Sequence, residues 1–306
     1  MHATRRIALG CACAFALVWA TPLRAEAPQT APPPRPTVEQ ARAIVRSLLV
    51  KSPYRISADA RAGEIRYRVR FEPQRDWAWP ETGEQRLVVD ANGAELRVCG
   101  DCGREAPPSA DELLRYTRAN AWVRSDDRRI RSFARTHTRG GSVASRMTRL
   151  TTAVQRHMTG AIDYRDYLDA VAAWETRGGD CTEYAVLLAA SARALGIPAR
   201  LAHGVAYSSR FTGEAHVFSP HVWVQVWDGT RWVSYDAGLG RFDAGHLALF
   251  VGDGTTDGLR PVALAMRALR IEDAVGIARG NEVGKTTPEA KPIDAEPLES
   301  GEAKSR

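Results

Sequence analysis

Residues 178–200 constrain the fold most, because they predict one helix with a defined start and a defined end. The stretch begins Gly-Gly-Asp-Cys-Thr-Glu-Tyr-Ala and closes Leu-Gly-Ile-Pro-Ala-Arg. Asp180 belongs to the residue types that cap helices. Gly196, with Pro198 beyond it, predicts where the helix stops. Tyr184 and Leu188 lie on one face of this helix, which therefore has to pack against another part of the chain.

Cys181 follows the predicted cap and would be the first helical residue. The partial positive charge at a helix start stabilises a thiolate, so we expect a lowered thiol pKa. A thiolate is the nucleophile that acyl transfer uses. The alternative is a small buried core residue, which many free cysteines are. The inward stripe of Tyr184 and Leu188 does not include Cys181, and this favours the nucleophile.

A predicted hairpin supplies a partner for this thiol. Asp228-Gly229 is a two-residue turn signal between two runs of strand-forming residues. If those two residues form the turn, His221 faces Asp236 with Cα atoms about 4.5–5.5 Å apart. A carboxylate in that place would orient the imidazole and stabilise its charged form. The alternative is a structural pair on a solvated sheet face, with the valines of the first strand on the buried face.

Three more histidines lie in the same region and are less favoured. His203 lies on a predicted strand, residues 200–206, where it could be part of the core. His216 is predicted in a polar loop beside the cleft. His246 follows the hairpin, and nothing in the sequence directs it toward Cys181.

The N-terminus predicts export. Residues 1–27 combine Arg5 and Arg6, an apolar segment too short for a comfortable membrane span, and small residues at a cleavage site. A retained membrane anchor is the alternative. Residues 28–36 form a proline-rich linker. We expect a periplasmic or secreted protein with no stable membrane span after removal of the signal peptide.

The charge of the chain argues against nucleic acid as a partner. The formal net charge is +6, and loss of the N-terminal segment, with three arginines and one glutamate, leaves +4. This basicity is weak, and no motif for binding RNA or DNA accompanies it.

Residues 37–106 predict a small α+β module. Thr37 and Gln40 form a capping-box pattern, residues 64–71 alternate as a half-buried strand, and Asn92-Gly93 marks a hairpin. Cys99 and Cys102 close the module. We expect a structural disulfide first, an incomplete metal site second and a redox pair last, because export favours oxidation and a zinc site needs about four ligands.

Residues 107–280 predict a second domain, with helices that start at Ser109, Asp127 and Ser142. Residues 281–306 are rich in Glu, Lys, Pro, Ala and Ser, and we expect them to be disordered.

Four sequence blocks together resemble the bacterial transglutaminase-like superfamily over about residues 110–255. They are Gly-Asp-Cys-Thr-Glu-Tyr-Ala at 179–185, Ala-Leu-Gly-Ile-Pro-Ala-Arg at 194–200, His-Val-Trp-Val at 221–224 and Trp-Val-Ser-Tyr-Asp at 232–236. The resemblance implies a papain-like α+β core, a helix bundle packed on an antiparallel sheet. It makes Cys181 the nucleophile, His221 the general base and acid, and Asp236 the orienting residue, with no cofactor and no metal.

The resemblance leaves the reaction open, since superfamily members include transglutaminases, peptidases and amidases. We expect a Cys181 thioacyl intermediate formed on the carboxamide of a peptide or protein, with a cell-wall peptide as one candidate, and resolved by water. The alternatives are a protein-crosslinking transglutaminase and a non-catalytic peptide-binding module. The backbone N–H of Cys181 is an expected oxyanion donor, and Trp174 and Trp223 are candidates for the second.

Overall fold

Five helices in the computed structural model begin directly after a side chain that the sequence marks as a cap. The structure describes residues 35–90, 93–165 and 167–277. Reciprocal capping boxes open three helices, at Thr37, Ser109 and Asp180. The eight helices of the described residues are α1 (Val38–Arg46), α2 (Ala58–Ala62), α3 (Ala110–Arg115), α4 (Arg128–His137), α5 (Val143–His157), α6 (Ala170–Thr176), α7 (Cys181–Arg193) and α8 (Leu259–Ala268).

A five-stranded antiparallel sheet carries the candidate site. Its strands are β1 (Val50–Lys51), β5 (Ala199–Phe211), β6 (Glu214–Trp227), β7 (Trp232–Tyr235) and β8 (His246–Gly252). They lie in the order β1-β6-β5-β8, and β7 also pairs with β6. The long strand β6 therefore receives β1 near its start and β7 near its end, both by antiparallel pairing.

A second antiparallel sheet contains the strands predicted for the N-terminal module. They are β2 (Glu64–Phe71), β3 (Gln85–Asp90) and β4 (Gly93–Val98), joined by β9 (Leu269–Ile277) in the order β3-β4-β2-β9. The predicted alternation of β2 is confirmed, because Ile65, Tyr67, Val69 and Phe71 are all buried. The hairpin is confirmed by the β3–β4 pairing, while its tip at residues 91–92 lies outside the described residues.

Each of the two domains predicted from the sequence contributes one strand to the sheet of the other. β1, from residues 37–106, joins the sheet of the later part, and β9, from residues 107–280, joins the sheet of the earlier part. Contacts between the sheets include the ring of Tyr67, which packs edge-on against Phe218 and donates a 2.7 Å hydrogen bond to the Ala244 carbonyl. Pro36 and the later described residues form one compact unit.

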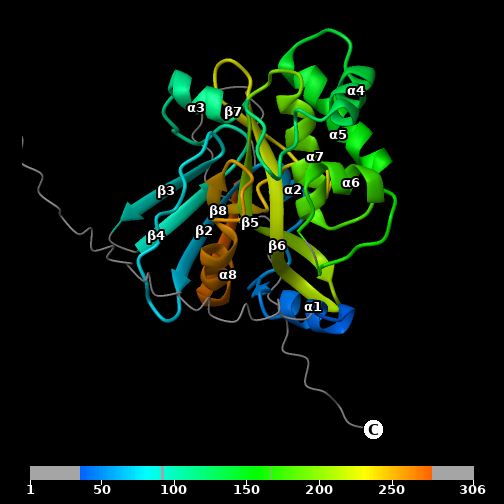
Figure 1. Cartoon of the computed structure of the whole chain (residues 1–306). Helices are drawn as coiled ribbons and strands as arrows, with labels where there is room; N and C mark the ends of the chain where they lie inside the picture. The colour runs from blue at the N-terminus through cyan, green and yellow to red at the C-terminus, as the bar shows by residue number, and fades with distance from the viewer. Residues whose placement is uncertain (1–34, 91–92, 166, 278–306) are drawn as a thin grey trace, which may run out of the picture. The chain divides into compact units, whose positions relative to one another are not determined.

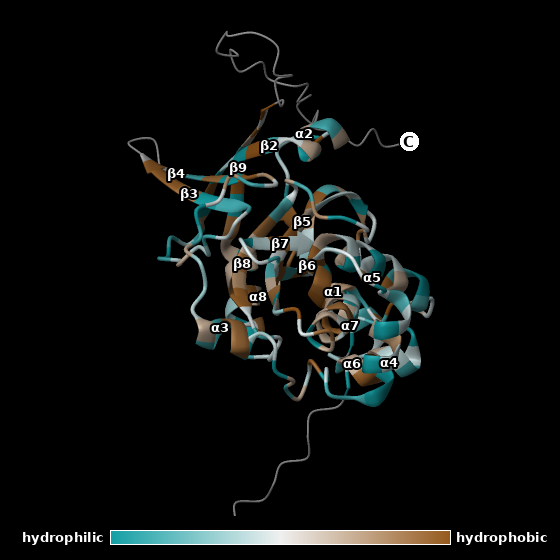
Figure 2. Cartoon of the chain, turned by 90° about the horizontal axis from the view of Figure 1, so that it is seen from above, coloured by the Kyte–Doolittle hydropathy of each residue, from teal (hydrophilic) through white to brown (hydrophobic). Residues whose placement is uncertain are grey.

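Helix α7 is buried between the large sheet and three other helices. It packs against β6 on one side and against α4, α5 and α6 on the others (Figure 1). Its side chains from Ala185 to Arg193 are all buried. Figure 2 shows apolar colour on β5 and β6 and hydrophilic colour on much of α4 and α5. This is the predicted helix bundle on an antiparallel sheet, and the α+β fold class is confirmed.

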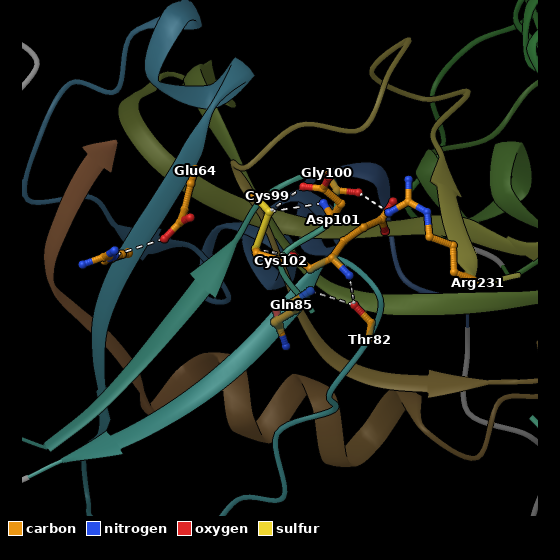
Figure 3. The surroundings of a disulfide bond; sticks show 10 residues. Glu64, Thr82, Gln85, Cys99, Gly100, Asp101, Cys102 and Arg231 are labelled. Atoms are coloured by element: carbon orange, nitrogen blue, oxygen red, sulfur yellow. Dashed lines mark hydrogen bonds and ion pairs between the residues drawn. A yellow bond between two sulfur atoms is a disulfide. The ribbon is translucent and has the colours of Figure 1, made fainter. Parts of the chain in front are cut away.

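Cys99 and Cys102 form a disulfide, as the first of the three sequence alternatives proposed (Figure 3). The loop that it closes contacts the large sheet, because Arg231 donates a 2.7 Å hydrogen bond to the carbonyl of Gly100. Glu64 lies near both sulfur atoms. Since both cysteines are committed to the disulfide, their thiolates are not available as metal ligands.

Three predictions concern residues that the structure does not describe. The signal peptide at 1–27 and the disordered tail at 281–306 lie outside the described residues, as does all of the proline-rich linker at 28–36 except its last two residues. Among the helices that are described, none combines the length and the apolar character that a membrane crossing requires.

Candidate active site

Cys181 is the first residue of α7, and its sulfur lies against the backbone of β6. Asp180 caps the helix by accepting a 2.8 Å hydrogen bond from the Thr182 N–H, and Glu183 accepts one of 2.8 Å from the Asp180 N–H. The Cys181 Sγ lies 3.9 Å from the Pro220 carbonyl oxygen, to which the thiol donates. It also accepts a hydrogen bond from the N–H of Val222.

This approach is possible because part of the β6 edge has no neighbouring strand. β1 pairs with residues 217–218 of β6, and β7 pairs with residues 224–227. Residues 219–223 therefore have β5 as their partner on one side and no strand of the described chain on the other. In a strand, the C=O of one residue and the N–H two residues later point the same way. Pro220 and Val222 accordingly offer an acceptor and a donor to the same sulfur atom.

His221 and Asp236 form a direct pair, with 2.7 Å between Nε2 and Oδ2. Because this bond occupies Nε2, the other ring nitrogen, Nδ1, remains for exchange with a thiol. Gly238 marks where the three predicted residues converge. A Cβ at position 238 would lie 3.3 Å from Asp236 Oδ1, 3.4 Å from His221 Cε1 and 3.6 Å from Cys181 Cβ. The absence of a side chain at 238 keeps this space open.

The predicted hairpin register is wrong by two residues. The observed pairs are Val224 with Tyr235 and Val226 with Val233, which places His221 two residues out of line with Asp236. Asp228 does not sit in the centre of the turn. It precedes the turn, and its carboxylate accepts hydrogen bonds from the N–H groups of Thr230 and Arg231. A shift by two residues keeps every side chain on its predicted face, so His221 and Asp236 still meet.

The face that carries this pair is buried, contrary to the solvated alternative. His221 is 5% exposed and Asp236 is 1% exposed. The N-terminal module covers this face, since the Glu84 carboxylate accepts a 2.8 Å hydrogen bond from the Ser234 N–H. Burial raises the pKa of Glu84 to about 7, against its hydrogen bonds to Ser234. The module therefore covers the part of this face around Ser234 and Gln225.

The expected lowering of the Cys181 pKa is wrong. Burial raises the pKa of this thiol well above its ordinary value, and the carboxylates of Asp180, Asp236 and Glu183 raise it further. The hydrogen bond from Val222 opposes this and is too weak to reverse it. The helix start alone does not predict the sign, because acidic groups converge on the same sulfur. Cys181 is consequently a thiol at neutral pH, and it needs a base to become a nucleophile.

His246, which the sequence analysis did not favour, contacts the His221–Asp236 pair. Its Nε2 lies 3.0 Å from Asp236 Oδ2, the same oxygen that binds His221, and its Nδ1 lies 3.3 Å from Asp243 Oδ1. Arg61 pairs with the other oxygen of Asp243 at 2.6 Å. Although burial opposes it, hydrogen bonding to Asp236 and Asp243 raises the pKa of His246 to about 9. Charges thus alternate from Arg61 through Asp243 and His246 to Asp236.

The charge on His246 predicts a pH-dependent stability. A histidine with a pKa of about 9 when folded and about 6.5 when unfolded stabilises the fold fully below pH 6.5. That contribution is lost as the pH rises through about 9. We expect the free energy of unfolding to fall by about 3 kcal/mol more in the wild type than in His246→Gln between pH 6.5 and 10. Chemical denaturation at each pH measures the difference, and parallel curves would contradict the assignment.

Three other residues that the sequence analysis considered have partners outside the Cys181, His221 and Asp236 group. His216 belongs to β6 and not to a loop, with its Nδ1 2.8 Å from the Tyr207 hydroxyl. Trp223 directs its Nε1 to the Ser234 hydroxyl at 3.2 Å, and Trp174 stacks on the ring of His157. Neither tryptophan is among the residues that line the cavity beside Cys181 and His221.

His221, Asp236 and His246 also form a group of metal-ligand types, with ligand atoms within 4.8 Å of one another. In this arrangement the Nε2 atoms of both histidines are directed at one oxygen of Asp236, at hydrogen-bond distances of 2.7 and 3.0 Å. Protons shared between nitrogen and oxygen account for these distances. The three side chains are therefore a hydrogen-bonded group in this structure.

The comparison with protein families agrees with this geometry. Residues 131–237 match the family model of the transglutaminase-like superfamily, a range that includes Cys181, His221 and Asp236. Residues 131–237 are therefore a transglutaminase-like domain, and the predicted resemblance is confirmed for this part of the chain. The match supports thiol-dependent acyl transfer as the general chemistry. No curated protein sequence matches the chain significantly.

Solved structures to which this chain is similar include those of two bacterial proteins. One is described as a candidate cysteine protease from Cytophaga hutchinsonii, at 15% identity and a TM-score of 0.42, covering 76% of this chain and 89% of that one. The other is the periplasmic domain of TgpA from Pseudomonas aeruginosa, at 15% identity and a TM-score of 0.39, covering 65% of this chain and 92% of that one.

Proposed function

We propose that this protein is a thiol hydrolase that acts on a carboxamide of a peptide or protein. Cys181 is the nucleophile, His221 is the general base and acid, and Asp236 orients the imidazole. One observation carries the proposal. Asp236 occupies the Nε2 of His221, and this leaves the Nδ1 to take a proton, while the residues converge around Gly238. The convergence of a thiol, an imidazole and a carboxylate is the arrangement that covalent acyl transfer needs.

The reaction begins with transfer of the Cys181 thiol proton to His221 Nδ1 as the sulfur attacks the carboxamide carbon. The oxyanion is placed near the N–H of Cys181, which as the first helical N–H has no acceptor within the helix. His221 then protonates the leaving nitrogen, the C–N bond breaks and a thioester remains. Water attacks the thioester after giving a proton to His221. The sulfur leaves and regains that proton, and the product is a carboxylic acid.

The raised thiol pKa gives His221 a larger part in this scheme than it would have beside a stable thiolate. Because Cys181 is protonated at rest, the nucleophile forms only when His221 accepts its proton. The resulting imidazolium is stabilised by the buried Asp236 carboxylate at 2.7 Å. Water is the expected acceptor, since it is far more abundant than any amine in the exported compartment that the N-terminus predicts.

The proposal is tested by measuring how the acyl group divides between water and an added amine. We expect a library of acetylated peptides with glutamine side-chain amides and C-terminal amides to give acids that incorporate ¹⁸O from labelled water. Addition of a primary amine at millimolar concentration should divert only a minor share of the product, measured by mass spectrometry. Predominant amine adducts would instead identify a crosslinking transglutaminase. Binding of peptides without any thioester or product would identify a binding module.

A further inference from the structure

A cavity of about 320 Å³ opens directly beside Cys181 and His221. It lies over the large sheet, between the start of α7 on one side and α8 on the other, and the residues that follow α1 also line it. Most of its wall is apolar. The large side chains that form this wall are those of Leu48, Ile162, Phe211, Leu259, Val262 and Met266. A volume near the lower end of the range for small-molecule pockets suits one large side chain and the backbone that carries it.

One polar side chain in this cavity has no partner. His203, on β5, is 2% exposed and lines the cavity beside Val222, its register partner on β6. Neither of its ring nitrogens has a hydrogen-bond partner among the described residues. Burial lowers the pKa of His203 to about 4, so the ring is neutral at pH 7 and offers one donor and one acceptor. An unmet buried donor or acceptor costs free energy, which a ligand that pairs with it recovers.

The contrast with other histidines of the described chain points to a ligand. His221 and His246 bond to Asp236, His216 lies at 2.8 Å from Tyr207, and His157 lies at 2.8 Å from the Trp174 carbonyl. His203 has an aromatic neighbour in Phe250 and no polar one. An ordinary core position would favour an apolar residue in these surroundings. The unpaired imidazole instead lies in the lining of a cavity that leads to the candidate nucleophile, and its two ring nitrogens stay covered until the ring turns toward that cavity.

We propose that this cavity receives a bulky, uncharged substrate side chain with a hydrogen-bonding group beyond an apolar body, as in tyrosine, and that His203 is the residue that recognises that group. This inference names the substrate class of the proposed hydrolase, and it rests on that proposed function. The apolar wall contacts the body of the side chain, and the neutral imidazole pairs with its hydroxyl. A charged side chain is disfavoured because most of the wall is apolar, and the carboxylate in the lining, Asp180, is already bound to the Thr182 N–H as the cap of α7.

Binding to a variant without the nucleophile tests this proposal separately from turnover. The probes are acetyl-alanyl-tyrosinamide, the matching phenylalaninamide and the matching argininamide, titrated into Cys181→Ala by calorimetry. We expect the tyrosine probe to bind at least about tenfold more tightly than the phenylalanine probe, because a site built to pair with a hydroxyl rejects the analogue that lacks it. The arginine probe should bind more weakly than either.

A second substitution assigns the preference to His203. In Cys181→Ala with His203→Phe, which fills the same space without polar atoms, the tyrosine and phenylalanine probes should bind within about twofold of each other. His203→Gln keeps a donor and an acceptor and should retain part of the preference. Equal binding of the tyrosine and phenylalanine probes to Cys181→Ala, or tightest binding of the arginine probe, would overturn the proposal. If the preference is found and no peptide is turned over by the wild type, the hydrolase proposal fails and the recognition site stands.

Discussion

Replacement of Cys181 by alanine is expected to abolish turnover, with kcat/KM falling at least about 10³-fold. His221→Ala should fall nearly as far, because a protonated thiol cannot attack without a base. The two residues act in one step, so the double variant should be no worse than the single variants by more than about threefold. Initial rates on the best peptide from the ¹⁸O experiment measure all three.

The fold should survive these changes, which separates a chemical role from a structural one. Cys181 is partly exposed at the start of α7, and its removal leaves no large void in the core. Thr176→Ala is the control, since it lies at the end of α6, outside the cavity beside Cys181, and has no part in the proposed step. It should keep kcat/KM within about threefold. Substantial activity in Cys181→Ala, above about one tenth of the wild type, would contradict the nucleophile assignment.

Local signals predicted most of the secondary structure around the site. Asp180 and Ser142 cap helices that begin one residue later, as capping chemistry requires. The alternation along Glu64–Phe71 and the hairpin over β3 and β4 also appear as predicted. Each of these signals depends on a few neighbouring residues. Long-range packing therefore has little opportunity to change the result.

The hairpin shows why a site can be predicted although its register is not. Asp228 is a strong turn residue, but side-chain bonding to Thr230 and Arg231 places it before the turn and not within it. That moves the register by two residues. Because strand side chains alternate with a period of two, the face of His221 and Asp236 is unchanged.

Groups brought together by tertiary structure could not be predicted in the same way. His246 lies on β8, which pairs with β5, and it reaches Asp236 in the loop that follows β7. No sequence spacing fixes that distance. The sign of the Cys181 pKa shift has the same origin, since its largest cause is burial of the thiol by the folded chain. The nearest sequence signal is the aspartate at 243, three residues before His246.

Asp236→Asn is expected to lower kcat/KM by about 10²- to 10⁴-fold, because it changes which nitrogen of His221 carries the proton. The carboxylate accepts a 2.7 Å hydrogen bond from the Nε2–H and leaves Nδ1 free to take the thiol proton. An amide that donates its own N–H to Nε2 would fix the proton on Nδ1, where it blocks that transfer. The loss should fall mainly on kcat, since Asp236 is 1% exposed and buried behind His221.

Asp243→Asn is the matched control, because it weakens the second carboxylate of His246 and leaves the His221–Asp236 bond in place. We expect a loss of at most about tenfold in kcat/KM, together with a lower pH for the loss of stability assigned to His246. Kinetics and denaturation of both variants measure this contrast. Equal kinetic losses would mean that both aspartates act by keeping His246 charged. A large loss confined to Asp236→Asn would mean that the carboxylate acts on the tautomer of His221, with His246 holding Asp236 in position and ionised.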